Sequence, residues 1–212
     1  MTEKYTGIDT FNKAYIPYYL QAAKEGCVIA IDTETTGLHN HDDIVQLAWV
    51  VMEKGEIRSR DYTNVQNLSV PINGTEAQKI NHLTDAFLML DGRSPNEVFG
   101  SMFYGILDYY ISRYGYVVLV GHNLQFDIRM LYHTITRYCK GADDIIALMR
   151  KGCLGCDTKE YVKALNLPKE VLPDNTLATC ISAFALDAAN THQALNDTIA
   201  CMELFRFLTT ED

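Results

Sequence analysis

Residues 31–38 read IDTETTGL, and this stretch decides what fold and chemistry we expect of the chain. It overlaps the end of an apolar run, residues 27–31, that predicts a buried strand. Asp32 and Glu34 come where that strand should end, one residue apart. Because alternate residues of a strand share a face, both carboxylates should point into the same space. Their charges repel unless a cation lies between them, so the pair indicates either a solvated turn or a metal site.

The composition is that of an ordinary globular domain: of 212 residues, 48% are hydrophobic and 21% are charged. No apolar run reaches the roughly 18 residues that a membrane-spanning helix needs, and the first residues lack the apolar segment of a signal peptide. We therefore expect a soluble, cytoplasmic protein without membrane contacts, whose six cysteines are reduced. The net charge of −9 argues against a long grip on duplex phosphates, but it leaves room for a site that takes a strand end.

The chain predicts an α/β fold with a mixed sheet flanked by helices. Strands are expected at residues 27–31, 44–52, 56–64, 116–120 and 153–158. Helices are expected at residues 94–113, 125–139, 159–165, 176–186 and 193–208, with a short one within residues 71–84. The 94–113 helix should turn Val98, Met102, Ile106 and Tyr109 inward. Residues 1–26 should form a helical extension packed on the core, and residues 27–212 the main domain.

Two later segments carry further acids. Asp127 lies in the expected first turn of the 125–139 helix, where the helix dipole favours a carboxylate. His192 should lie before the last helix and Asp197 near its first turn. Each residue taken alone has an ordinary structural explanation, as a helix cap or a surface histidine. In α/β sheets, however, the chemistry gathers where strands end.

Taken together, these motifs resemble a known family. Residues 32–38 (DTETTGL), residues 123–127 (NLQFD) and the HxAxxD pattern of residues 192–197 are similar, in this order and at these separations, to the DEDDh group of 3′–5′ exonucleases. That group has the ribonuclease H-like fold and includes the proofreading subunit of bacterial replicative DNA polymerase. The likeness covers about residues 27–208, so the main domain is expected to be an exonuclease domain.

The resemblance implies a metal site and a reaction. Asp32, Glu34, Asp127 and Asp197 would hold two Mg²⁺ or Mn²⁺ ions, because hard cations prefer oxygen ligands. In the family, the residues matching Asp32, Glu34 and Asp197 ligate the ion that activates water, Asp32 bridges to the second ion, and Asp127 acts largely through water. His192 would be the general base, since an unperturbed imidazole titrates near neutral pH. A nucleoside 5′-monophosphate would leave a single-stranded 3′ end, and a DNA polymerase is the partner that the resemblance suggests.

Other residues of these motifs are candidates for holding the strand end. They are Thr33, Thr35, Thr36, Gly37, Leu38, Asn81, His82, Asn123 and Phe126. The threonines offer hydroxyls and amides, Leu38 an apolar wedge, and Phe126 a ring that could stack on a base or belong to the core. The family usually has a His-Gly-Ile-Thr-like stretch where residues 81–84 read NHLT, so the histidine is displaced by one position. This displacement leaves open whether Asn81 or His82 contacts the nucleotide.

Two further features have alternative interpretations. Residues 129–169 hold eight lysines and arginines against four acids, which fits either a solvated surface or a nucleic-acid contact. Cys153 and Cys156 have the spacing of zinc ligands, and His133 and Cys139 could complete a set of four. Thiols on a strand also pack well as small hydrophobic groups.

Three functions are compatible with this pattern. The first is a two-metal 3′–5′ exonuclease acting on single-stranded DNA, towards which the Thr-Thr-Gly form of the first motif leans. The second is an exoribonuclease that trims RNA ends, since nothing in the sequence shows whether a 2′-hydroxyl is read. The third is a catalytically silent nucleic-acid-binding or polymerase-docking module. The presence of all four acids and the histidine argues against the third.

Overall fold

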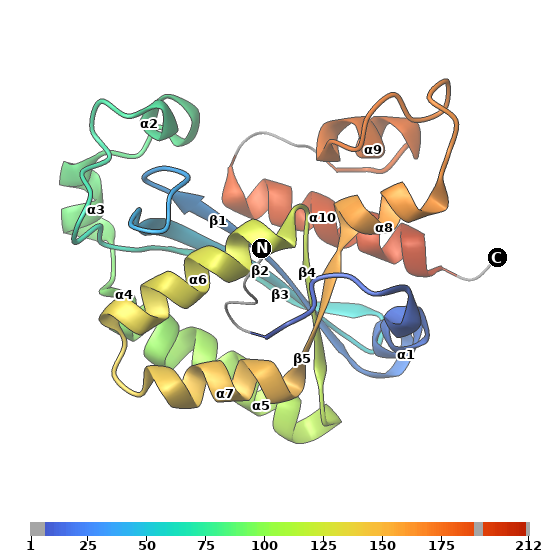
Figure 1. The fold of residues 1–212 in the computed structure, drawn as a ribbon, viewed down its shortest axis with the longest axis horizontal. Helices are drawn as coiled ribbons and strands as arrows, with labels where there is room; N and C mark the ends of the chain where they lie inside the picture. The colour runs from blue at the N-terminus through green and yellow to red at the C-terminus, as the bar shows by residue number, and fades with distance from the viewer. Residues whose placement is uncertain (1–6, 189–192, 211–212) are drawn as a thin grey trace.

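A five-stranded mixed sheet forms the centre of the part of the protein that the computed structural model describes, residues 7–188 and 193–210 (Figure 1). Its order is β3-β2-β1-β4-β5. The strands are β1 (Cys27–Thr35), β2 (Ile44–Glu53), β3 (Glu56–Asn64), β4 (Val117–Gly121) and β5 (Cys153–Asp157). β1 pairs antiparallel with β2 and parallel with β4, which in turn pairs parallel with β5. The expected α/β class and mixed sheet are confirmed.

Helices cover both faces of the sheet. They are α1 (Ile16–Glu25), α2 (Glu76–Asn81), α3 (Asp85–Asp91), α4 (Pro95–Glu97), α5 (Tyr104–Tyr114), α6 (Leu124–Tyr138), α7 (Ala142–Gly152), α8 (Thr158–Leu165), α9 (Leu177–Ala183) and α10 (Ala194–Thr209). α5, α6 and α7 pack on one face, and α1, α8 and α10 on the other. In Figure 1, α2 and α3 form a small lobe to the left of the sheet.

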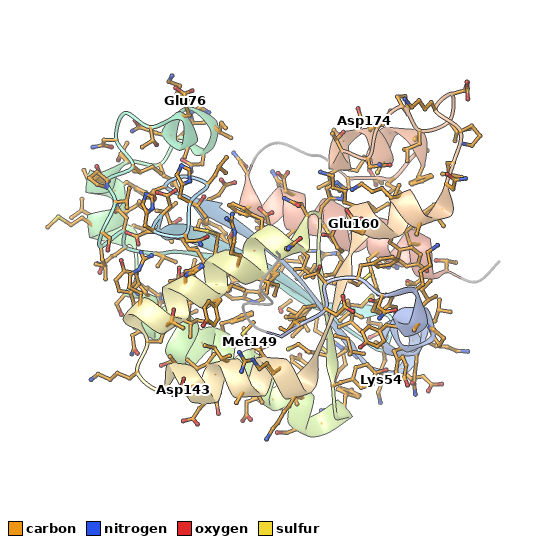
Figure 2. The ribbon with its side chains drawn as sticks, in the orientation of Figure 1. Lys54, Glu76, Asp143, Met149, Glu160 and Asp174 are labelled. Carbon is orange, nitrogen blue, oxygen red and sulfur yellow. The ribbon has the colours of Figure 1, made fainter. Side chains whose placement is uncertain are left out.

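The alternation of strand side chains builds a core on each face. In β1, Ile29 and Ile31 pack towards α5, α6 and α7, whereas Val28 and Ala30 pack towards α1 and α10. On α7, Met149 is buried and Asp143 is exposed; both side chains are labelled in Figure 2. Strands covered on both sides read as nearly continuous apolar runs, so the first polar residues stand out where the runs stop.

The helix expected at residues 94–113 contains a π-helical segment, Val98–Phe103, between α4 and α5. The wider turn shifts the following side chains around the helix axis. Phe99, Phe103 and Leu107 are therefore buried, while Tyr109 is 56% exposed. The prediction that Tyr109 points inward is wrong, because it assumed a regular 3.6-residue period.

Two other elements differ from the sequence prediction. β1 does not end at Ile31 but continues through both acids to Thr35, because β2 keeps pairing with it as far as Ile44. The prediction omits α7, although Ile145 and Met149 lie on its buried face. None of the described helices is both long enough and apolar enough to cross a membrane.

The N-terminal segment covers the edge strand β5. The Asp157 amide donates to the Thr10 carbonyl (2.7 Å), and the Tyr19 hydroxyl donates to the Gly155 carbonyl (2.5 Å). A Cβ at Gly155 would lie 2.6 Å from the Asp9 carbonyl oxygen, so a side chain there would force the two backbones apart. The segment therefore protects a strand edge that would otherwise be available for pairing with another chain.

Gly155→Ala should lower the melting temperature, since the added methyl group costs on the order of 1–3 kcal/mol by overpacking against the N-terminal backbone. Gly105→Ala is the matched control, because open space surrounds its Cβ position in α5 and a helix favours alanine over glycine by about 1 kcal/mol. Thermal denaturation should give shifts of opposite sign for the two variants. A Gly155→Ala protein as stable as wild type would contradict this packing.

Candidate active site

Acidic side chains from three elements converge at one end of the sheet. Asp32 and Glu34 lie on the face of β1 that α10 covers, and Asp197 lies in the first turn of α10. Asp127 lies in the first turn of α6, which follows β4 closely. Because β1 and β4 run parallel, their carboxyl ends meet at the same edge of the sheet. The structure thus brings together four of the residues singled out in the sequence.

The charges that act on Asp32 within this cluster have the same sign as its own. Burial raises the pKa of Asp32 well above its usual value, and the charges of Asp127, Glu34 and Asp197 raise it further. Burial, followed by the charge of Asp197, raises the pKa of Glu34 to about 7. Burial also raises the pKa of Asp127 to about 7. At neutral pH these carboxyls therefore take up either protons or cations.

Asp127 is held in place by hydrogen bonds to β1. Its Oδ1 atom accepts from the Thr33 amide (3.0 Å) and from the Thr33 hydroxyl (2.7 Å), and the residue is 4% exposed. Thr33 lies between the two strand acids and faces the opposite side of β1. This contact joins the first turn of α6 to β1, and so it sets the spacing between the helix acid and the strand acids.

The donor set suits a hard divalent cation. The converging side chains all offer carboxylate oxygens, and every influence that shifts the pKa of Asp32 penalises its charged form, a penalty that a bound cation would remove. Among residues 7–188 and 193–210, no three acidic, histidine or cysteine side chains are already close enough to surround one ion. Asp32, Glu34, Asp127 and Asp197 are the residues that would hold a cation at this end of the sheet.

A cavity of about 320 Å³ opens beside Glu34 between β2, β3, the α2–α3 lobe and the start of α10. Carboxamides and aromatic rings line much of it, contributed by Gln46, Tyr62, Asn64, Asn81, Phe87, Gln193 and Asn196. The Gln46 amide donates to Asn64 Oδ1 (2.8 Å), which fixes the orientation of both groups. The Asn81 Nδ2 atom is buried and forms no hydrogen bond of regular geometry, but it lies near enough to Glu34 to lower the pKa of that acid by hydrogen bonding. Asn81 therefore faces the site.

The three threonines predicted to bind the strand end already make hydrogen bonds within the protein. The Thr35 hydroxyl donates to the Gly37 carbonyl (2.6 Å), and the Thr36 hydroxyl accepts from the Asp43 amide (3.0 Å). The Thr33 hydroxyl is taken up by Asp127. These hydroxyls shape the turn after the acids, together with the Thr36 amide, which donates to the Asp43 carbonyl (2.9 Å).

Leu38 stands at the open side of this turn. Its side chain is 71% exposed, which is unusual for a leucine so near a cluster of buried residues. The preceding Gly37 has no room for a side chain, because a Cβ there would lie 2.4 Å from Asp42 Oδ2. The tight contact between Gly37 and Asp42 thus fixes where the exposed leucine begins.

The remaining predicted contacts differ in their surroundings. His82 ends α2 in a left-handed conformation (φ 60°), which favours glycine or asparagine, and it is exposed. Asn123 is also left-handed (φ 74°), and its amide donates to Asp157 Oδ1 (3.0 Å). Phe126 is half-buried against the core. The structure therefore turns Asn81, rather than the neighbouring histidine, towards the acids.

His122 is a residue near the site that the sequence analysis does not single out. Its Nε2 donates to the Asn175 carbonyl (2.8 Å), which can only accept, so its Nδ1 accepts from the Thr158 hydroxyl (3.0 Å). Burial lowers the pKa of His122 to about 4, so the ring is neutral at pH 7. It joins the end of β4 to the segment before α9. The available signal was a polar Gly-His-Asn closure directly after an apolar strand.

The predicted general base, His192, lies outside the described residues, so its role stays a prediction.

Cys153 and Cys156 pack into the cores on opposite faces of β5, where they cannot share one ion. The zinc interpretation of this pair is therefore wrong, because three residues along a strand reverse the side-chain direction.

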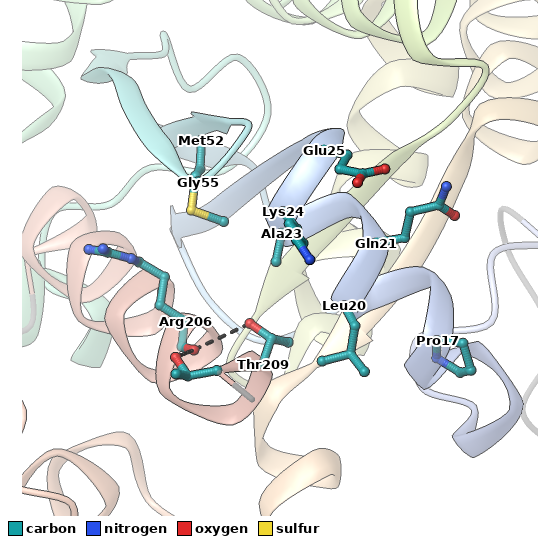
Figure 3. Close-up of a pocket in the computed structure, with 11 residues that line it drawn as sticks. Pro17, Leu20, Gln21, Ala23, Lys24, Glu25, Met52, Gly55, Arg206 and Thr209 are labelled. Atoms are coloured by element: carbon teal, nitrogen blue, oxygen red, sulfur yellow. Dashed lines mark hydrogen bonds between the residues drawn. The ribbon is translucent and has the colours of Figure 1, made fainter. Parts of the chain in front are cut away.

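A larger cavity of about 660 Å³ lies between α1, the β2–β3 turn and the end of α10 (Figure 3). Its lining includes Leu20, Lys24, Met52 and Arg206. Met52 pairs with Val28 near the start of β1, whereas the acids lie near the end of that strand. This cavity is therefore separate from the acid cluster.

The sequence matches a known family along most of its length. The model of the RNase_T family, described as an exonuclease, matches residues 29–205. The chain belongs to this exonuclease family. No curated protein sequence matches the chain significantly.

Solved structures share the fold of this exonuclease-family chain. E. coli exonuclease I in complex with a dT13 oligonucleotide has a TM-score of 0.67 at 16% identity, over 88% of this chain and 41% of that one. The zinc ion-bound form of the E. coli exonuclease I–ssDNA complex has a TM-score of 0.65 at 16% identity, over 88% and 40%. Exonuclease X in complex with 5′ overhanging duplex DNA has a TM-score of 0.50 at 18% identity, over 85% and 90%. The expected ribonuclease H-like fold is confirmed, and the chain spans about two fifths of exonuclease I.

In the absence of a cation, the stability of this exonuclease-family chain should fall as the pH rises from 4.5 to about 7. Over this range the folded state keeps protons on Glu34 and Asp127 that the unfolded state releases, so each pH step favours unfolding. A raised pKa of this size corresponds to on the order of 3 kcal/mol for one carboxyl. The lowered pKa of His122 acts in the opposite direction over the same range, so wild type is compared with Glu34→Gln, which keeps His122. Urea denaturation in EDTA should show a smaller fall, or a larger rise, in stability with pH for Glu34→Gln than for wild type. The same pH dependence in both proteins would contradict the raised pKa of Glu34.

Asp32→Asn should raise the melting temperature in EDTA at neutral pH, because it removes the charge that the other acids oppose. The same change should abolish the stabilisation by Mg²⁺ that we expect for wild type. Asp85→Asn is the control: although burial opposes it, hydrogen bonds from the Ile72 amide and Asn67 lower the pKa of Asp85, so losing this charge should destabilise. An Asp32→Asn protein that melts below wild type in EDTA would refute the repulsion.

Proposed function

We propose that this chain is a 3′–5′ exonuclease that uses two divalent cations, Mg²⁺ or Mn²⁺, to release nucleoside 5′-monophosphates from single-stranded DNA ends. The observation that carries the proposal is the convergence of Asp32, Glu34, Asp127 and Asp197, where burial and mutual repulsion raise carboxyl pKa values. Membership of the exonuclease family supports the class of reaction.

In this proposal the carboxylates hold the cations and the histidine handles the proton. Two divalent cations, when bound, activate a water molecule and stabilise the oxygen that leaves phosphorus. Asp32, Glu34, Asp127 and Asp197 would hold these cations, and Asp32 is central among them, since the other three acids all raise its pKa. His192 accepts the proton of the attacking water, as a neutral imidazole can do near pH 7.

The strand end would lie between Leu38 and the cavity beside Glu34. Leu38 offers exposed apolar surface for the last base, and Asn81 Nδ2 is a buried donor beside Glu34. Roles for His82, Asn123 and Phe126 stay predictions from the sequence. Roles for Thr33, Thr35, Thr36 and Gly37 in holding the strand end also stay predictions from the sequence.

DNA is the proposed substrate. The solved relatives named above hold an oligonucleotide or an overhanging DNA duplex. A DNA polymerase partner, a proofreading role and a cytoplasmic location are parts of the proposal that rest on the sequence. The division into an extension (1–26) and an exonuclease domain (27–212) also belongs to it, supported by the contact of Tyr19 with β5.

With Mg²⁺, the purified protein should shorten a 5′-labelled single-stranded DNA one nucleotide at a time from its 3′ end. Asp32→Asn and His192→Ala should each lower kcat by about 10²-fold or more, because one removes a cation ligand and the other the general base. Glu203→Gln is the control, since Glu203 pairs with Arg206 on the outer side of α10. Wild-type rates in both active-site variants would overturn the assigned roles.

Single-stranded DNA should be a better substrate than RNA of the same sequence, as measured by kcat/KM. Faster hydrolysis of the RNA would favour the exoribonuclease alternative, in which the site reads a 2′-hydroxyl. Binding of either strand without hydrolysis would favour the silent module. Matched oligonucleotides, assayed in one buffer with the same cation, make the comparison.

A further inference from the structure

The turn that carries Leu38 is held from outside by helix α6. Residues 36–43 connect β1 to β2, and four of them, residues 38–41, are exposed. Hydrogen bonds within the connection, such as that from the His39 amide to Asp42 Oδ2 (2.6 Å), shape the turn itself. The turn presents Leu38 four residues after Glu34, so the contacts that fix its position matter for the site.

Arg129 of α6 contacts the tip of the turn. Its guanidinium donates to the Leu38 carbonyl (3.0 Å) and to Asn40 Oδ1 (3.2 Å). The same group lies over the Phe126 ring, 5.3 Å from its centroid. The planar guanidinium therefore joins the backbone of the exposed leucine to a side chain of the first helical turn.

Arg137, at the other end of α6, contacts the second half of the turn. It donates to the Asn40 carbonyl (2.7 Å), to the His41 carbonyl (3.0 Å) and to Asp43 Oδ1 (3.1 Å). Three acceptors on separate residues match the fixed fork of a guanidinium, which a single ammonium group cannot reproduce.

Asp43 connects this contact to the rest of the molecule. Its side chain is 2% exposed, and it accepts from the Tyr138 hydroxyl (2.8 Å) and from the amides of Ser69 (2.7 Å) and Val70 (3.1 Å). A buried carboxylate with an arginine partner is costly to disturb, because losing either member leaves the other charge unpaired. The end of the turn is therefore anchored to both α6 and the segment after β3.

α6 also carries Asp127, which is bonded to Thr33 of β1. Arg129 and Arg137 are eight residues apart, about 12 Å along the helix axis, so one rigid rod holds the turn at both ends. Any movement of the turn relative to Asp127 must break bonds to that rod. Helix α6, which supplies Asp127, thus also fixes the position of the 37–43 turn relative to that acid.

We propose that Arg129 and Arg137 are positioning residues, which act through the 37–43 turn to hold Leu38 where the 3′ end of the strand binds. The proposal rests on the exonuclease function proposed above. Both guanidinium groups donate to backbone or side-chain oxygens of the turn. Their role is therefore to hold Leu38, and they do not pair with phosphates of the bound strand.

Arg137→Gln should raise KM for a single-stranded DNA about tenfold and leave kcat within about twofold, because the chemistry is intact while the strand end is poorly seated. Arg137→Lys should fall between this variant and wild type, since it keeps the charge near Asp43 but loses the fork. Arg206→Gln is the matched control, as it removes one positive charge from the surface of α10.

The decisive measurement is a double-mutant cycle with Leu38→Ala. If Arg137 acts through Leu38, the double variant should have the KM of Leu38→Ala alone. Multiplied effects of the two changes would overturn the proposal. So would a fall of about one in the slope of log KM against log salt for Arg137→Gln, because that loss indicates a phosphate contact.

Hydrogen–deuterium exchange separates this proposal from the proposed function. Amides of residues 37–43 should exchange faster in Arg137→Gln than in wild type, and by a larger factor than the amides of β1 and β4, whether or not the protein cleaves DNA. Unchanged exchange would refute the positioning role. A wild-type protein that does not hydrolyse DNA would refute the function while leaving the exchange result to decide the positioning.

Discussion

Four carboxylates occupy one end of the sheet, and their mutual repulsion is the constraint on which the arrangement of the site depends. Burial and neighbouring charges both raise the pKa of Asp32, so the folded chain holds its acids together at a cost in free energy. Such a cost is typical of functional sites, where the surrounding structure forces unfavourable neighbours together. A bound divalent cation would offset the repulsion and lower the free energy of the folded state. A cluster of acids that is destabilising by itself therefore indicates a metal site.

The rest of the fold supplies the rigidity that this cluster needs. β1 and β4 lie side by side and are buried on both faces, which brings the strand acids next to the start of α6. Thr33 bonds Asp127 to β1, and the neutral His122 bonds the end of β4 to the segment before α9. These hydrogen bonds satisfy polar groups that would be costly to bury unpaired in an apolar core. The polar residues at the strand ends are therefore held in fixed positions.

The open side of the site is built differently from its closed side. The sheet that carries the acids packs against apolar cores on both faces. Beside Glu34, in contrast, the cavity is lined by carboxamides and aromatic rings, and Arg129 and Arg137 of α6 hold the 37–43 turn. Carboxamides and guanidinium groups hold backbone and side chains in place without adding negative charge. This division suits the proposed function, in which an anionic strand end enters an acidic protein of net charge −9.

The sequence by itself determined the fold class, the main strands and the pairing of Asp32 with Glu34, because apolar runs and i, i+2 spacing are local properties of the chain. Asp127 and Asp197 were joined to this pair only by the resemblance of their motifs to the exonuclease family. The sequence did not determine that β1 runs on through Asp32 and Glu34, since that extension depends on pairing with β2. The sequence prediction misplaced Tyr109, because a π-helical segment changes the helical period and no residue type marks where such a segment occurs. The direction of Asn81, the opposite faces of Cys153 and Cys156, and the hold of α6 on the Leu38 turn were decided only by tertiary structure. Each depends on which residues far apart in the chain become neighbours, and periodicity along the sequence carries no information on that.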